Sequence, residues 1–114
     1  MNTGALGEEA ALQWYLAEGY TLLARNYHAR QGEIDLIVQN AETLVFVEVK
    51  TRGQNRLGTP AEWVDARKQE KIRGAALHYL ERHHLGDPPL RFDVVEVLVD
   101  KAGSLTINCI PNAF

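Results

Sequence analysis

The chain has 114 residues, of which 46% are apolar and 24% charged, and its formal net charge is −3. This length predicts a single domain over residues 1–114, and no apolar run approaches the roughly 20 residues that a membrane-spanning helix needs. Cys109 is the only cysteine, which excludes an intramolecular disulfide and a cysteine-based zinc cluster, so we expect a cytoplasmic protein. The negative charge argues against a protein that coats nucleic acid by bulk electrostatics, although basic residues gather between Arg25 and Arg73.

The first half of the chain predicts one helix followed by three strands. The helix covers residues 5–18 and ends at Gly19, because glycine is favoured just beyond a helix C-terminus. Runs of β-branched and aromatic residues, separated by short polar turns, predict strands over 20–28, 33–39 and 43–51.

The second half predicts another helix and two more strands. The Thr-Pro-x-Glu segment at 59–62 is typical of a helix start, and the helix is expected to run to about His83 with a kink near Gly74. Alternating strands follow over 90–99 and 104–110. The order α-β-β-β-α-β-β predicts an α/β (α+β) fold in which helices flank a central mixed sheet.

Two charged side chains interrupt the apolar strand at 43–51. Both faces of this strand are apolar, which predicts a central strand that is covered on both sides. Glu48 and Lys50 share the face that also carries Leu44 and Phe46. Burying unpaired charge is costly, so these residues need a partner or a function. Two interpretations stay open at this point: a structural ion pair between Glu48 and Lys50, and a functional site.

A second carboxylate interrupts the neighbouring strand at 33–39. Alternation places Asp35 on the face opposite to Ile34, Leu36 and Val38. A short turn after this strand makes it a hairpin partner of the next one, so we expect Asp35 and Glu48 to face the same side.

Two neighbouring carboxylates raise each other's pKa unless a cation neutralises them. The cation would be either the ammonium of Lys50 or a divalent ion. Oxygen ligands of this kind suit Mg²⁺ or Mn²⁺, and such an ion can activate water beside a phosphate. The pattern of Asp35, Glu48 and Lys50 therefore favours phosphodiester hydrolysis.

Both predicted helices also carry a charged residue within an apolar stripe. Glu8 falls in the middle of the first stripe, either as a site residue or as a first-turn acid that the helix dipole favours. Lys68 falls inside the second, either as a site residue or with its stem lying along apolar surface and its amine in water. Gln69 lies beside that stripe and could donate to a ligand. The stripes consist of Ala11, Leu12, Tyr15 and Leu16, and of Ala61, Val64, Ile72, Ala75 and Tyr79.

Several motifs make the sequence resemble the YraN-type bacterial proteins over nearly its whole length and in the same order. These motifs are Gly7-Glu8-Glu9-Ala10-Ala11, Gly32-Glu33-Ile34-Asp35-Leu36-Ile37, Leu44-Val45-Phe46-Val47-Glu48-Val49-Lys50-Thr51-Arg52, Gly58-Thr59-Pro60-Ala61-Glu62, Arg67-Lys68-Gln69, Arg91-Phe92-Asp93-Val94-Val95 and Asn112-Ala113-Phe114.

That family is similar to archaeal Holliday-junction resolvases, within the restriction-endonuclease-like PD-(D/E)xK superfamily of nucleases. The resemblance implies a helix packed on a mixed sheet, with Asp35, Glu48 and Lys50 in the three positions of the superfamily pattern. Glu8 matches the acidic residue that resolvase-like members place on their first helix. The proline that precedes the aspartate in the superfamily is Ile34 here.

Two hypotheses follow. The first is a Mg²⁺- or Mn²⁺-dependent DNA endonuclease or exonuclease that acts on branched or single-stranded DNA in repair or recombination. Asp35, Glu48 and the Val49 carbonyl would hold the ion, Glu8 a water or second ion, and Lys50 the attacking water. Phosphate contacts are expected from Arg52, Arg67, Lys68, Gln69, Lys71 and Arg73.

The second hypothesis is a non-catalytic module that binds nucleic acid or a protein and keeps the carboxylates in a structural network with Lys50 and Lys68. A homodimer would suit two-fold symmetric substrates such as four-way junctions. Trp14 and Trp63 lie off their stripes, where they either pack against other elements or mark a dimer face or a base-stacking contact. Asp93 is expected to brace the fold.

Three histidines lie near the end of the second predicted helix. The histidines at 78, 83 and 84 belong to a surface helix end rather than a metal site, because adjacent histidines point apart.

Overall fold

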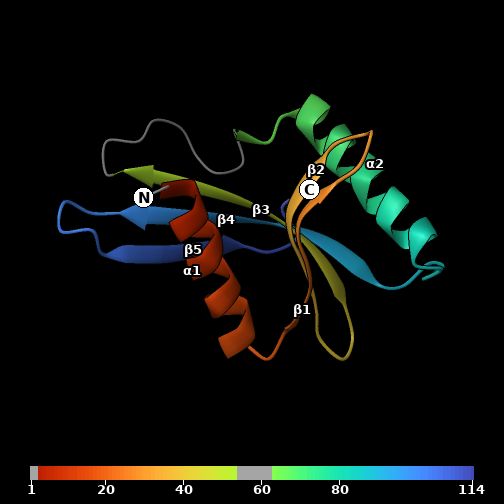
Figure 1. The fold of residues 1–114 in the computed structure, drawn as a ribbon, viewed down its shortest axis with the longest axis horizontal. Coiled ribbons are helices and arrows are strands. Elements are labelled where there is room, and N and C mark those ends of the chain that lie inside the picture. Colours follow the sequence, from red (N-terminus) through yellow and green to blue (C-terminus); the bar gives the residue numbers. More distant parts are fainter. Residues whose placement is uncertain (1–2, 54–62) are drawn as a thin grey trace.

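A five-stranded mixed sheet with one helix on each face forms the computed structural model, which describes residues 3–53 and 63–114 (Figure 1). The element order is the predicted one, and it matches the restriction-endonuclease-like arrangement that the resemblance implied. The elements are α1 (Thr3–Ala17), β1 (Thr21–His28), β2 (Glu33–Gln39), β3 (Leu44–Gly53), α2 (Ala66–Arg82), β4 (Leu90–Val99) and β5 (Leu105–Ile110).

The strands lie in chain order across the sheet, β1-β2-β3-β4-β5. All neighbours pair antiparallel except β3 and β4, which are parallel. Parallel neighbours cannot be joined by a tight turn, and α2 lies in the long connection between these two strands. No helix within the described ranges is long and apolar enough to cross a membrane.

Strand β3 is central and buried on both faces, as its sequence predicted. Val45 and Val47 lie in the core under α1, together with Tyr15 of that helix. Phe46 lies in the core under α2, together with Tyr79. Period-two alternation along β3 thus supplies both cores, and it puts Glu48 on the α2 side of the sheet.

Ile34 corrects the predicted face of β2. Alternation placed it with Leu36 and Val38, yet it lies in the α2-side core beside Ile37. The paired register between β2 and β3 runs from Gln39↔Leu44 to Leu36↔Val47 and stops there. Residues 33–35 therefore do not follow the alternation of residues 36–39, which pair with β3. The strand β2 diverges from β3 at Asp35.

The start of α2 also differs from the prediction. Thr59, Pro60 and Glu62 lie outside the described residues, but Trp63 and Val64 precede the helix, which begins at Ala66. Asp65 is the N-cap, and its Oδ1 accepts the Lys68 backbone N–H at 2.9 Å. An aspartate here satisfies an amide that the helix itself leaves unpaired. From this cap α2 continues without interruption past Gly74, where a kink was predicted.

On α1 the buried stripe is narrower than predicted. Leu16 is 41% exposed, whereas Ala11, Leu12 and Tyr15 are buried. Trp14 packs against the α1-side core, with its ring centroid 5.0 Å from that of Tyr15. The packing interpretation of this tryptophan is therefore confirmed.

Candidate active site

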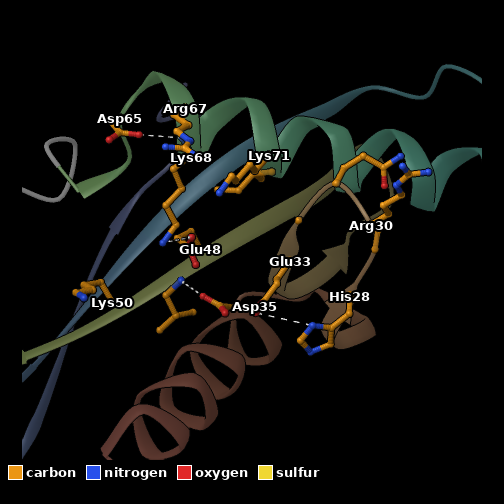
Figure 2. A pocket seen from close by; sticks show the side chains of 15 residues that line it. His28, Arg30, Glu33, Asp35, Glu48, Lys50, Asp65, Arg67, Lys68 and Lys71 are labelled. Atoms are coloured by element: carbon orange, nitrogen blue, oxygen red, sulfur yellow. Dashed lines mark hydrogen bonds and ion pairs between the residues drawn. The ribbon is translucent and has the colours of Figure 1, made fainter.

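A pocket of about 930 Å³ lies between the N-terminal half of α2, the strands β2 and β3, and the turn between β1 and β2 (Figure 2). The turn between β1 and β2 packs tightly against α2 and closes one side of the pocket. A Cβ atom at Gly32 would lie only 2.7 Å from the Lys71 carbonyl oxygen, so the close approach requires glycine. The predicted site residues along its lining are Asp35, Glu48, Val49, Lys50, Arg67, Lys68 and Lys71.

Asp35 and Glu48 meet at the point where β2 leaves β3. They follow directly on Leu36↔Val47, which is the last pair of the antiparallel register. Beyond this pair the backbone hydrogen bonds between the two strands end. The Val49 N–H instead donates to Oδ2 of the Asp35 side chain at 2.7 Å. The divergence of the two strands therefore opens the pocket and fixes the carboxylate inside it.

Burial raises the pKa of Asp35 to about 8, and the adjacent Glu48 carboxylate adds to this rise. The Val49 N–H and the Lys68 ammonium act in the opposite direction, but they do not outweigh burial. At neutral pH the Asp35 carboxyl group consequently keeps its proton. A bound divalent cation would reduce the repulsion between the Asp35 and Glu48 carboxylates when both are ionised.

Lys68 rather than Lys50 is the cation that contacts Glu48. Its Nζ lies 3.0 Å from Glu48 Oε2, with 51% of the Lys68 side chain exposed and 13% of that of Glu48. Lys50 lies farther along β3 at the edge of the pocket, and its side chain is exposed (Figure 2). Among the described residues, the ion pair between Glu48 and Lys50 that the sequence left open is not formed.

Glu8 of α1 lies close enough to Asp35 for their charges to interact, although it is not among the residues that line the pocket. Partial burial raises the pKa of its carboxyl group, and the nearby charge of Asp35 raises it further. The Asn26 side chain hydrogen-bonds Glu8 and lowers its pKa. Asn26 has a φ of 48°, a left-handed conformation that asparagine tolerates better than most residues. The sequence interpretation missed this residue, although an asparagine within a run of β-formers was a visible signal.

Three of the predicted phosphate contacts lie away from the pocket lining. Gln69 Nε2 donates to the Val64 carbonyl at 2.9 Å and so braces the start of α2. The Arg73 guanidinium lies over the Phe114 ring, 5.2 Å from its centroid. The Arg52 guanidinium lies 4.2 Å from the Trp63 ring centroid. Arg30, which was not predicted, lines the pocket from the turn between β1 and β2.

The donor set at the pocket suits a hard divalent cation that keeps several of its waters. Within residues 3–53 and 63–114, no group of three or more His, Cys, Asp or Glu side chains is placed to hold a metal. Mg²⁺ commonly takes one or two carboxylates and completes its shell with water, so Asp35 and Glu48 are sufficient. The Val49 N–H points toward Asp35, and since N–H and C=O of a strand residue face the same edge, its carbonyl lies on that side too.

Residues 7–97 match the model of the uncharacterised protein family UPF0102. The chain belongs to this family. It is 50% identical to a UPF0102 protein of Symbiobacterium thermophilum, covering 99% of this chain and 96% of that one. A UPF0102 protein of Syntrophomonas wolfei is 45% identical, with 97% and 96% covered, and one of Clostridioides difficile 41%, with 97% and 95%. The predicted kinship with the YraN-type proteins is thereby confirmed.

The raised pKa of Asp35 gives this UPF0102 protein a specific dependence of stability on pH. Between 3.8, the ordinary value, and about 8, the folded state retains a proton that the unfolded chain has lost. The free energy of unfolding therefore falls as the pH rises through this window. Asp35→Asn removes the effect, so we expect the variant to be more stable than wild type at pH 8 by about 1–2 kcal/mol, after screening by water in the open pocket.

Thermal unfolding of both proteins at pH 5.5 and pH 8, without divalent ions, measures this effect. The difference in Tm should grow toward pH 8, by several degrees. An equal difference at both pH values would show that the Asp35 carboxyl does not titrate in this range.

Proposed function

We propose that this UPF0102 protein is a metal-dependent nuclease that hydrolyses phosphodiester bonds in DNA, on branched or single-stranded substrates in repair or recombination. The observation that supports it is the Asp35–Glu48 pair at the divergence of β2 and β3, in a pocket with basic residues around it. Two adjacent, partly buried carboxyl groups, of which Asp35 keeps its proton at neutral pH, are costly to a fold, and a bound divalent cation would offset that cost.

Asp35, Glu48 and the Val49 carbonyl would hold Mg²⁺ or Mn²⁺. When bound, the ion would polarise a phosphate oxygen and lower the pKa of a water molecule beside it. The Val49 N–H donates to Asp35 Oδ2 and so fixes the orientation of this carboxyl group in the pocket. Glu8 would orient a water from the α1 side, and Lys50 at the pocket edge would position the attacking water.

The rim of the pocket offers contacts to the phosphate backbone. Arg67, Lys68 and Lys71 project from the N-terminal half of α2, and Arg30 comes from the opposite turn (Figure 2). Such side chains bind phosphates without reading bases, which fits a substrate recognised by its shape and charge. We place the reaction in the cytoplasm, where chromosomal DNA of a bacterium is found.

A cleavage panel tests this function. Labelled four-way junction, flap, single-stranded and duplex DNA are incubated with the full chain and Mg²⁺ or Mn²⁺, with EDTA as the matched control. We expect cleavage of the junction, flap or single strand that EDTA abolishes. If no substrate is cut with either ion, the nuclease assignment is wrong.

One observation favours a second function, a non-catalytic module with the same fold. The Lys68–Glu48 ion pair is the kind of network in which such a module would keep its carboxylates. Titration with Mn²⁺ separates the two functions, because a module of this kind has no need of the ion. If the protein binds DNA but does not bind Mn²⁺ at concentrations up to several millimolar, the non-catalytic module is favoured.

A further inference from the structure

Lys68 contacts the same carboxylate that the proposed function assigns to the metal. Its ammonium lies 3.0 Å from Glu48 Oε2, and it also lowers the pKa of Asp35 by its charge. The cap at Asp65 holds the backbone of Lys68 in the first turn of α2, directly above β3 (Figure 2). The Lys68 ammonium therefore interacts with both carboxyl groups of the proposed metal site.

We propose that Lys68 is a built-in competitor of the divalent cation: it neutralises Glu48 until the ion binds, and is then released toward the phosphate. This inference rests on the proposed function, since it concerns the same ion and the same substrate. It assigns to Lys68 a regulatory role in metal binding, in addition to the phosphate contact predicted from the sequence.

Charge and exposure make the exchange feasible. Two cations on one carboxylate repel each other, so an ion bound by Glu48 weakens the contact with the ammonium. The Glu48 side chain is 13% exposed and fixed on a central strand, whereas that of Lys68 is 51% exposed on a flexible four-carbon stem. Lys68 is accordingly the partner that moves.

The direction of its movement follows from the lining of the pocket. Lys68 lines the pocket together with Arg67 and Lys71 of the same helix. An ammonium repelled from Glu48 stays within this basic rim, where a phosphate would bind. Without the ion, the Lys68 ammonium covers the Glu48 carboxylate. With the ion bound, the ammonium joins the basic rim and can contact a phosphate.

Isothermal titration of the full chain with MnCl₂ tests the proposal without reference to cleavage. The variants are Lys68→Gln and, as a matched control, Lys71→Gln, which removes the same charge one turn along the same pocket. We expect Lys68→Gln to bind Mn²⁺ about threefold to tenfold more tightly than wild type, the range expected when a partly exposed ion pair no longer competes. Lys71→Gln should change the affinity clearly less.

Each other result overturns the proposal. An unchanged or weaker Mn²⁺ affinity in Lys68→Gln means that Lys68 does not compete for the ligand oxygens. Equal gains in both variants mean a general effect of net charge. If wild type cleaves DNA and binds Mn²⁺ but Lys68→Gln binds it no more tightly, only this inference fails. If no variant binds Mn²⁺ and no DNA is cut, the proposed function fails with it. Circular dichroism of each variant confirms that it is folded.

Discussion

Asp35→Asn is expected to reduce metal-dependent DNA cleavage by at least about 100-fold, or about 2.7 kcal/mol in the activation free energy. The asparagine keeps the shape of the side chain and an oxygen that can accept the Val49 N–H. It removes the negative charge that would bind the cation next to Glu48. Initial rates on the best substrate of the panel, at saturating Mg²⁺, measure the loss.

Glu42→Gln is the matched control, since it removes a carboxylate from the exposed turn at the other end of the same hairpin. Its cleavage rate should equal that of wild type. The stability expected of Asp35→Asn at pH 8 separates lost chemistry from lost folding. Cleavage by Asp35→Asn within threefold of the wild-type rate would remove Asp35 from the metal site.

Asp93→Ala is expected to lower the free energy of unfolding by about 3–5 kcal/mol, the usual cost of breaking a buried ion pair by removing one partner. Asp93 is fully buried, and Arg91 donates to it from Nε at 2.9 Å and from Nη2 at 3.2 Å. The Tyr15 hydroxyl donates to the same carboxylate at 2.8 Å, and the Asn112 backbone N–H at 3.0 Å. The variant leaves all of these donors without their acceptor.

Urea unfolding followed by tryptophan fluorescence measures this loss. Tyr15→Phe is a milder variant for comparison, because it removes one donor to Asp93 and keeps the ring packed. It should lower the free energy of unfolding by about 1 kcal/mol. In the Asp93→Ala background Tyr15→Phe should cost clearly less, since the acceptor is already gone. A loss below 1 kcal/mol for Asp93→Ala would show that water replaces the carboxylate.

The pairing of Asp35 with Glu48 could be predicted because it depends on local rules. Two strands joined by a short turn are enough to bring the carboxylates together, even though alternation misplaced the neighbouring Ile34. The role of Lys68 was only partly visible: a lysine in an apolar stripe is ambiguous until the helix is placed on the sheet. The bracing role expected of Asp93 is confirmed by its contacts with Tyr15 of α1 and with Asn112 near the end of the chain.

Other features depend on tertiary structure and left no clear signal in the sequence. Ile34 changes face because β2 diverges from β3, and no periodicity records that divergence. The choice of Lys68 over Lys50 as the partner of Glu48 depends on the height of α2 above β3. The helix start was misplaced because Thr59 and Asp65 both resemble caps, and a buried Val64 fits a helix stripe as well as a connection.

The parallel pairing of β3 with β4 also determines when the site can form during folding. Leu44 lies beside Leu90, and the segment between them must close before this pairing is stable. Such long-range closure is slow and occurs late compared with the formation of a hairpin. The hairpin of β2 and β3 can bring Asp35 to Glu48 early, but Lys68 reaches them only once α2 has docked. A nascent chain would therefore carry its acidic pair before the basic side chains of α2 are in place.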